Sequence, residues 1–253
     1  MLNYVEYGKE NKYDDDIFFQ KYSQMSRSQQ GLAGAGECET LRKLLPDFKD
    51  KRVLDLGCGY GWHCIYAMEH GASSVVGVDI SHKMLEVAKE KTHFPQVEYK
   101  CCAIEDVEFP EESFDVILSS LAFHYVADYE ILVKKIYRIL KSGGKLVFTV
   151  EHPVFTAYGT QDWYYNEKGE ILHFPVDNYY YEGKRTAVFL GEKVTKFHRT
   201  LTTYLNTLLS NGFIINHIVE PQPPEYMMDI PGMQDEMRRP MMLIVSANKK
   251  VDR

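Results

Sequence analysis

The stretch "RVLDLGCGYGWHC", residues 52–64, places an apolar run directly before three glycines at alternate positions. The run at residues 52–56 has the composition of a buried strand. Gly57, Gly59 and Gly61 let the backbone turn sharply and let a ligand approach the next helix without meeting a Cβ atom. The sequence therefore predicts a strand, a ligand-binding turn and a helix in this order.

The spacing of the glycines bears on which ligand the turn binds. In the dinucleotide fingerprint G-x-G-x-x-G, the third glycine follows the second by three residues. Trp62 occupies that position here, and its indole would crowd the close contact between helix and strand. Asp79 ends the next apolar run, 22 residues after Gly57, where a carboxylate can accept hydrogen bonds from ribose hydroxyls. The pattern therefore favours an adenosine-containing ligand and disfavours a dinucleotide.

Working outward, apolar runs alternate with amphipathic segments from about residue 40. Ser81 is a candidate N-cap for the helix "HKMLEVAKEK". Near-continuous apolar strands joined by helices predict a doubly wound parallel sheet covered on both faces. The predicted strands lie at residues 52–57, 73–80, 97–102, 113–123, 145–150, 213–220 and 240–247, and the predicted helices at residues 38–48, 62–71, 82–91, 129–140 and 199–213.

After Val150 the alternation stops. Residues 151–196 are rich in aromatic and turn-forming residues and lack a helical period, which indicates an inserted β-rich cap. The sequence thus divides into an N-terminal segment with the ligand-binding half of the α/β unit (1–150), an aromatic cap (151–196) and a C-terminal completion of the α/β unit (197–253).

Composition restricts the partners. The formal net charge of −7 repels a nucleic-acid backbone. The opening residues lack the pattern of a secretory leader, and no uncharged apolar stretch approaches 18 residues, so we expect a cytoplasmic protein with no membrane partner. The five cysteines form no C-x-x-C pair and are expected to be reduced thiols. No His, Cys or Asp cluster has metal-site spacing, so no metal is expected.

The segments "VLDLGCGYG" and "VVGVDIS" resemble the class I S-adenosylmethionine-dependent methyltransferases, especially the type 11 group that acts on small molecules. The similarity continues through "AIEDVEFPEESFDVILSSLAFHYV" and "RILKSGGKLVFTV", and covers about residues 47–150. This resemblance implies a Rossmann-like sheet of seven strands, mostly parallel with the last strand antiparallel. It also implies S-adenosyl-L-methionine as cofactor and a small-molecule acceptor.

The resemblance also implies roles for individual residues. Asp55 would order the glycine loop and contact the cofactor ammonium, and Asp79 would bind the ribose. The segment "FFQKYSQMSRSQQGLAGAGE" would fold over the cofactor. The implied cofactor site consists of Tyr22, Arg27, Asp55, Gly57, Gly59, Gly61, Asp79, Ile80, Met84, Ala103, Ile104, Glu105, Ser119 and Leu121. In it, Tyr22 would cover the methionine end, Arg27 would pair with its carboxylate, and Ser119 and Leu121 would face the transferred methyl.

The acceptor side offers two candidate bases. His124 follows the fourth strand and His152 follows the fifth, at the same edge of the sheet. Either imidazole could remove a proton from a hydroxyl or amine, or simply orient the acceptor. Aromatic cap residues could enclose an aromatic or cationic acceptor or could pack as ordinary sheet residues, and His198 and Arg199 could contact substrate or cap the following helix. These cap residues are Tyr158, Trp163, Tyr164, Tyr165, Phe174, Tyr179, Tyr180 and Tyr181.

Other functions remain open on the sequence. A nicotinamide-linked oxidoreductase is the enzyme alternative, although the chain shows no evident Tyr-x-x-x-Lys pair. A non-catalytic S-adenosylmethionine-binding regulator is the second alternative. Methyltransferases that act on nucleic-acid amino groups place an Asn/Asp-Pro-Pro-aromatic turn after the fourth strand, where this chain has "SSLAF".

Overall fold

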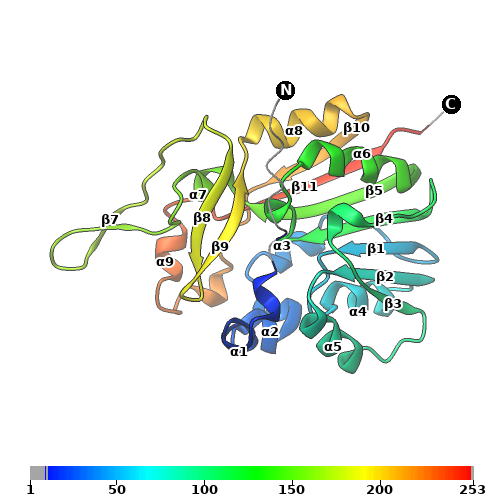
Figure 1. The fold of residues 1–253 in the computed structure, drawn as a ribbon, viewed down its shortest axis with the longest axis horizontal. Coiled ribbons are helices and arrows are strands. Elements are labelled where there is room, and N and C mark those ends of the chain that lie inside the picture. The colour runs from blue at the N-terminus through cyan, green and yellow to red at the C-terminus, as the bar shows by residue number, and fades with distance from the viewer. Residues whose placement is uncertain (1–8, 10, 252–253) are drawn as a thin grey trace.

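Seven strands form one sheet in the computed structural model, which describes residue 9 and residues 11–251 (Figure 1). The strand order is β10-β11-β5-β4-β1-β2-β3. β11 pairs antiparallel with both β5 and β10, while the other neighbours pair in parallel. The fold class expected from the sequence is thereby confirmed. The strands are β1 (Arg52–Leu56), β2 (Ser74–Asp79), β3 (Val97–Cys101), β4 (Phe114–Ser120), β5 (Leu140–Glu151), β10 (Phe213–Val219) and β11 (Met242–Lys249).

Helices cover both faces of the sheet because its strands are apolar on both faces. Along β1, Val53 packs with Leu41, Ala67 and Leu85 on one face, and Leu54 packs with Leu132 on the other. The first of these faces is covered by α3 (Cys38–Arg42), α4 (Trp62–Glu69) and α5 (His82–Lys91), the second by α6 (Tyr129–Ile139) and α8 (Leu201–Ser210). The alternation of buried side chains on each strand thus produces two cores.

Local signals set several of these boundaries. Ser81 is the N-cap of α5, as predicted, and its hydroxyl accepts a hydrogen bond from the Met84 amide at 3.1 Å. The helix expected at residues 38–48 is shorter and ends at Arg42. The helix α6 ends at Ile139, because Leu140 is already extended, and Gly143 and Gly144 lie within β5.

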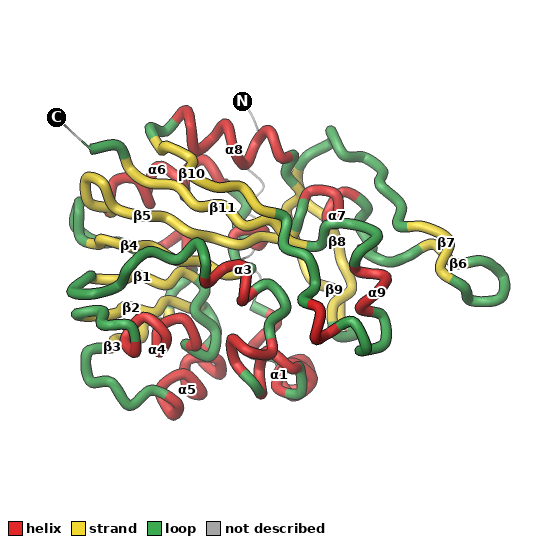
Figure 2. The backbone as a smooth tube through the Cα atoms, turned by 180° about the vertical axis from the view of Figure 1, so that it is seen from behind, coloured by secondary structure: helices red, strands yellow, loops and turns green. Residues whose placement is uncertain are grey.

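The insertion after β5 contains a short helix and two hairpins. The hairpin of β6 and β7 projects away from the sheet in both views (Figure 1, Figure 2). The β8–β9 hairpin packs back toward the N-terminal helices, since Phe18 is buried against Ala187 and Val194. The elements are α7 (Pro153–Ala157), β6 (Tyr164–Tyr165), β7 (Ile171–His173), β8 (Gly183–Phe189) and β9 (Glu192–His198).

Two further segments lie at the same end of the sheet as the insertion after β5. The N-terminal segment forms α1 (Asp16–Ser23) and α2 (Ser26–Gln29), and the loop between β10 and β11 contains α9 (Met233–Glu236). Residues 1–8, on which the expectation about a leader partly rests, lie outside the described residues. Within the described part of the chain, no helix has the length and apolar character needed to cross a membrane.

Candidate active site

The turn after β1 is tied to the end of β2. The amides of Gly57 and Cys58 both donate to the Val78 carbonyl, at 2.8 and 2.9 Å. Gly57 has a φ of 77°, and a Cβ there would lie 2.4 Å from the Ala122 Cβ. Gly59 has a φ of 51°, and a Cβ there would meet no atom within 4 Å. The backbone at Gly59 therefore faces open space, as a ligand-binding turn requires.

Asp79 ends β2 beside this turn. Its Oδ2 accepts a hydrogen bond from the Gly59 amide at 2.9 Å, and its Oδ1 accepts one from the Ser81 amide at 2.9 Å. Burial raises the pKa of the carboxyl, and the backbone donors oppose that effect. The carboxylate is thus fixed against the glycine turn and presents its remaining lone pairs to the adjoining cavity.

A cavity of about 390 Å³ lies at this edge of the sheet, within the usual size range of ligand sites. Most of the residues implied for the cofactor site line it, together with the candidate base His124. These are Tyr22, Arg27, Gly57, Gly59, Asp79, Ile80, Met84, Ala103, Ile104, Glu105, Leu121 and His124. The lining extends from β2 across to the end of β5, where Glu151 lies.

Four of the predicted site residues do not line the cavity. Ser119 donates from its hydroxyl to the Leu56 carbonyl at 2.7 Å, and Ser120 lines the cavity instead. Asp55 lies buried behind the turn, where burial raises its pKa to about 7 and the Cys64 thiol donates to it at 3.5 Å. Gly61 packs against Tyr99.

His152 is the fourth of these residues. It caps α7, with its Nδ1 accepting from the Val154 amide at 3.1 Å, and its Nε2 lies 2.9 Å from Glu220 Oε1. Its imidazole is therefore engaged in structural contacts outside the cavity lining.

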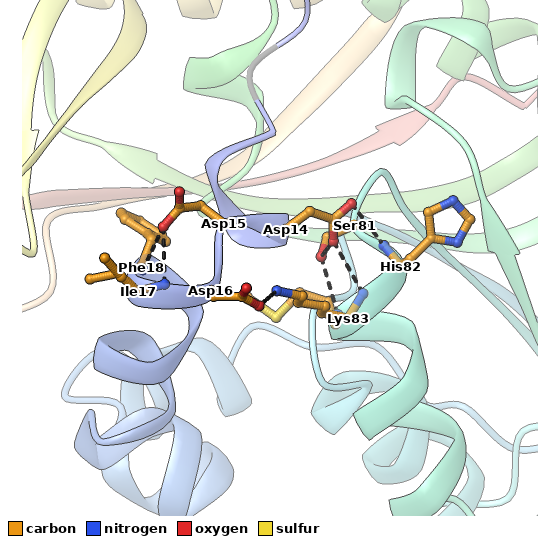
Figure 3. A network of polar contacts seen from close by, with 9 residues as sticks. Asp14, Asp15, Asp16, Ile17, Phe18, Ser81, His82 and Lys83 are labelled. Carbon is orange, nitrogen blue, oxygen red and sulfur yellow. Dashed lines mark hydrogen bonds and ion pairs between the residues drawn. The ribbon is translucent and has the colours of Figure 1, made fainter.

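The N-terminal segment is fastened to α5 (Figure 3). Asp14 accepts hydrogen bonds from the Ser81 hydroxyl at 2.6 Å and from the Lys83 amide at 3.2 Å. Lys83 also pairs with Asp16. On its other side, the segment donates from Lys21 Nζ to the Leu190 carbonyl of the β8–β9 turn at 2.9 Å. The segment thus spans from α5 to the insertion, and its Tyr22 and Arg27 line the cavity.

Arg27 pairs with Glu37, a residue that sequence reasoning missed. Glu37 is buried and lines the cavity, and its Oε2 has no hydrogen-bond partner among the described residues. A smaller hollow of about 80 Å³, also lined by Arg27, Glu37 and Ser120, adjoins it. A guanidinium and a carboxylate side by side complement the carboxylate and ammonium of an amino-acid group. The only sequence signal was that Glu37 ends the same quoted segment that contains Arg27.

His124 lies in the turn after β4. The Glu151 amide donates to its Nδ1 at 3.4 Å, which leaves the proton of a neutral ring on Nε2. Burial lowers the pKa of His124 to about 4, although Glu151 opposes the shift. The imidazole is therefore neutral at physiological pH and suited to donate a hydrogen bond, whereas its low pKa makes it a weak base.

His198 and Arg199 are buried and absent from the cavity lining. His198 contacts the Thr156 hydroxyl at 2.7 Å and the Tyr179 carbonyl at 2.9 Å. Arg199 donates to the carbonyls of the turn that carries His124, including that of Ala127 at 2.9 Å. The cap of the following helix is Thr200. Both residues therefore hold the walls of the site and do not form its surface.

The aromatic cap residues singled out from the sequence do not line the cavity. Trp163 and Phe174 surround the Arg239 guanidinium, at 5.0 and 4.8 Å from the ring centroids, and Tyr180 is 87% exposed. The cavity wall near the insertion instead comes from the β8–β9 hairpin, the loop before β11 and the first residue of β11. Its residues are Phe189, Met233, Met241 and Met242. In residues 9 and 11–251, no group of three His, Cys, Asp or Glu side chains is placed to hold a metal.

Comparison with known proteins gives this geometry a context. The sequence profile of a family described as "Methyltransferase domain" matches residues 54–148. A structure from Listeria monocytogenes, assigned to the S-adenosylmethionine-dependent methyltransferases, is 57% identical, with 87% of this chain and 99% of that one covered and a TM-score of 0.83. An S-adenosylmethionine-dependent methyltransferase from Mesorhizobium loti is 40% identical, with 87% and 100% covered and a TM-score of 0.80.

A more distant similarity concerns the central part of the chain. It is 36% identical over 112 residues to a ubiquinone biosynthesis O-methyltransferase of Coxiella burnetii. The aligned region covers 44% of this chain and 47% of that enzyme.

Proposed function

Because the chain belongs to the S-adenosylmethionine-dependent methyltransferases, we propose that it transfers the cofactor's methyl group to an oxygen or nitrogen atom of a small organic acceptor. The observation that carries the proposal is one continuous cavity that reaches from Asp79 at the end of β2 to Glu151 at the end of β5. We place the cofactor and the acceptor side by side along this cavity. The similarity to an O-methyltransferase of ubiquinone biosynthesis supports a small acceptor.

The residues present fit the cofactor. Asp79 would accept hydrogen bonds from the ribose, and Gly59 offers backbone with no Cβ in the way. Arg27 and the unsatisfied oxygen of Glu37 would hold the amino-acid end. The adenine would lie among the apolar residues beyond Asp79, which are Ile80, Met84, Ala103 and Ile104.

When bound, the cofactor would supply a methyl group on a positively charged sulfur for in-line attack by the acceptor's lone pair, and the sulfur would keep the electrons of the broken bond. The protein's main tasks are then to align the acceptor and to exclude water. Leu121 and His124 lie at the end of β4, in the middle of the cavity edge. His124 would orient the acceptor through its Nε2 proton, and the acceptor's own proton would pass to solvent once the cavity opens to release the product.

The N-terminal segment would serve as the lid. It carries Tyr22 and Arg27, and it is fastened to α5 by Asp14 and to the β8–β9 hairpin by Phe18 and Lys21. A lid of this kind sequesters the reaction from water. We also propose a cytoplasmic location, which the five unpaired cysteines support because disulfides are rare there.

The proposal is tested with methyl-labelled S-adenosylmethionine and a cell extract separated into small metabolites, proteins and nucleic acids. The expected result is label in the metabolite fraction, reduced at limiting cofactor concentration when Asp79 is replaced by alanine. Label confined to the protein or nucleic-acid fraction would overturn the small-molecule assignment while leaving methyl transfer itself intact.

A further inference from the structure

A ring of three polar side chains lies at the end of β5, and one of them, Glu151, forms part of the cavity wall. Glu151 Oε1 lies 2.5 Å from Lys196 Nζ, which also donates to Gln161 Oε1 at 2.8 Å. The Gln161 amide closes the ring by donating to Glu151 Oε2 at 2.7 Å. Lys196 is 3% exposed. Each carboxylate oxygen of Glu151 thus has one partner from the protein, and a carboxylate oxygen can accept more than one hydrogen bond.

This ring carries two opposite charges that cancel. Burial alone would raise the pKa of Glu151, but His124, Lys196 and Gln161 together lower it, so the carboxylate is ionised. The Lys196 ammonium also lies 6.0 Å from the Tyr125 ring centroid and 5.6 Å from that of Phe189. Both rings face a cation that is already paired. This end of the cavity therefore presents a hydrogen-bond acceptor without a net charge.

Most of the rest of this wall is apolar and adaptable, although the His124 imidazole also lines it. Phe189, Val126, Met233 and Met241 line it. Methionine side chains are flexible and make favourable contacts with aromatic rings. β5 is three strand positions from β2 in the sheet, about 14 Å at the usual spacing. The end with Glu151 is thus distinct from the end where Asp79 would hold the ribose.

We infer that this end of the cavity takes an uncharged acceptor with a flat apolar body and one O–H or N–H group that donates to Glu151, and that the Glu151–Lys196 pair excludes anions and cations. The inference rests on the proposed function, since it assigns the space to the acceptor. An anionic group would meet the Glu151 carboxylate at close range. A cationic group would find that carboxylate already neutralised and the Lys196 ammonium beside it. A neutral O–H or N–H group can donate to Glu151 without separating Glu151 from Lys196.

Three probes of one shape and different charge test the inference. They are 2-naphthol, 2-naphthoate and 2-naphthylmethylammonium, each titrated by calorimetry at neutral pH into protein saturated with S-adenosylhomocysteine. The expected result for the wild-type protein is binding of 2-naphthol at least about tenfold tighter than either charged probe. The same order of affinities is expected for Lys193→Met, a matched control at an exposed lysine of the same strand.

Changes to the pair should redirect the preference by charge. Glu151→Gln leaves the Lys196 ammonium unpaired and should make 2-naphthoate the tightest of the three probes. Lys196→Met leaves the Glu151 carboxylate unpaired and should favour 2-naphthylmethylammonium. The double variant Glu151→Gln/Lys196→Met, which removes both charges, should restore the preference for 2-naphthol. It also remains informative if a single variant does not fold, because it buries no lone charge.

The outcomes separate this inference from the proposed function. If S-adenosylhomocysteine does not bind, the proposed function fails. If it binds but no probe binds, or the wild-type protein prefers a charged probe, or the folded variants keep the wild-type order, the acceptor assignment fails and the methyltransferase assignment stands.

Discussion

Replacing Asp79 by alanine tests how the end of β2 contributes to cofactor binding. The substitution removes the carboxyl proposed to accept hydrogen bonds from two ribose hydroxyls, and it also removes the acceptor that holds the Gly59 and Ser81 amides. Hydrogen bonds to charged groups contribute about 1.5–3 kcal/mol each, part of which water replaces. We therefore expect a net loss of about 1–3 kcal/mol in binding free energy, which corresponds to a rise of about 5- to 150-fold in Kd.

The assay is calorimetric titration of S-adenosylhomocysteine into the folded variant. Asp115→Ala is the matched control, because Asp115 also accepts a strand amide, that of Arg52 at 2.9 Å, but lies outside the cavity lining. The control should lose stability and keep its Kd. An unchanged Kd in Asp79→Ala, or an equal weakening in both variants, would refute the assignment of Asp79 to the ribose.

Three other changes probe separate parts of the account. Asp14→Ala removes the acceptor of the Ser81 hydroxyl and Lys83 amide. Cofactor affinity should then fall about fivefold and amide exchange in residues 15–29 should speed up. Unchanged exchange would contradict the assignment of this segment as a lid. His124→Gln should lower turnover without altering its pH profile, because the imidazole is neutral above a pKa of about 4. A wild-type rate that rises with pH, with an apparent pKa near that of free histidine, would instead indicate that His124 is a base. Asp55 has an ordinary pKa of 3.8 and a folded pKa of about 7, so the folded state binds more protons than the unfolded state between these values. The free energy of unfolding should therefore fall as pH rises through that window. Asp55→Asn should flatten this dependence in urea titrations, and an unaltered slope would show that Asp55 does not cause it.

The sheet and the glycine turn could be predicted because their signals are local. The apolar runs of β1 and β2, the glycines between them and the N-cap at Ser81 are each set by residues within a few positions of one another. The choice of Ser119 over Ser120 failed for a different reason. β4 ends at Ser120, and Leu121 turns with a φ of 53°, so the side-chain alternation along the strand does not tell which serine meets the cavity.

The end of the cavity at Glu151 could not be predicted because distant segments build it. Glu151 and Lys196 are 45 positions apart, and their pairing depends on how the β8–β9 hairpin folds back over the sheet. The aromatic residues of the insertion looked suited to a ligand, but Trp163 and Phe174 instead surround Arg239 of a later loop. That contact positions the loop between β10 and β11, whose methionines line the cavity. Nothing in the sequence of the insertion indicates that Arg239 is the partner of these rings.

A crystal structure of the complex with S-adenosylhomocysteine is the most direct test of the two-ended cavity. The account predicts the ribose at Asp79, the amino-acid group between Arg27 and Glu37, and the sulfur facing the space that ends at Glu151. An adenine ring or an amino-acid group lying against Glu151 would contradict the account, because the space assigned to the acceptor would then belong to the cofactor.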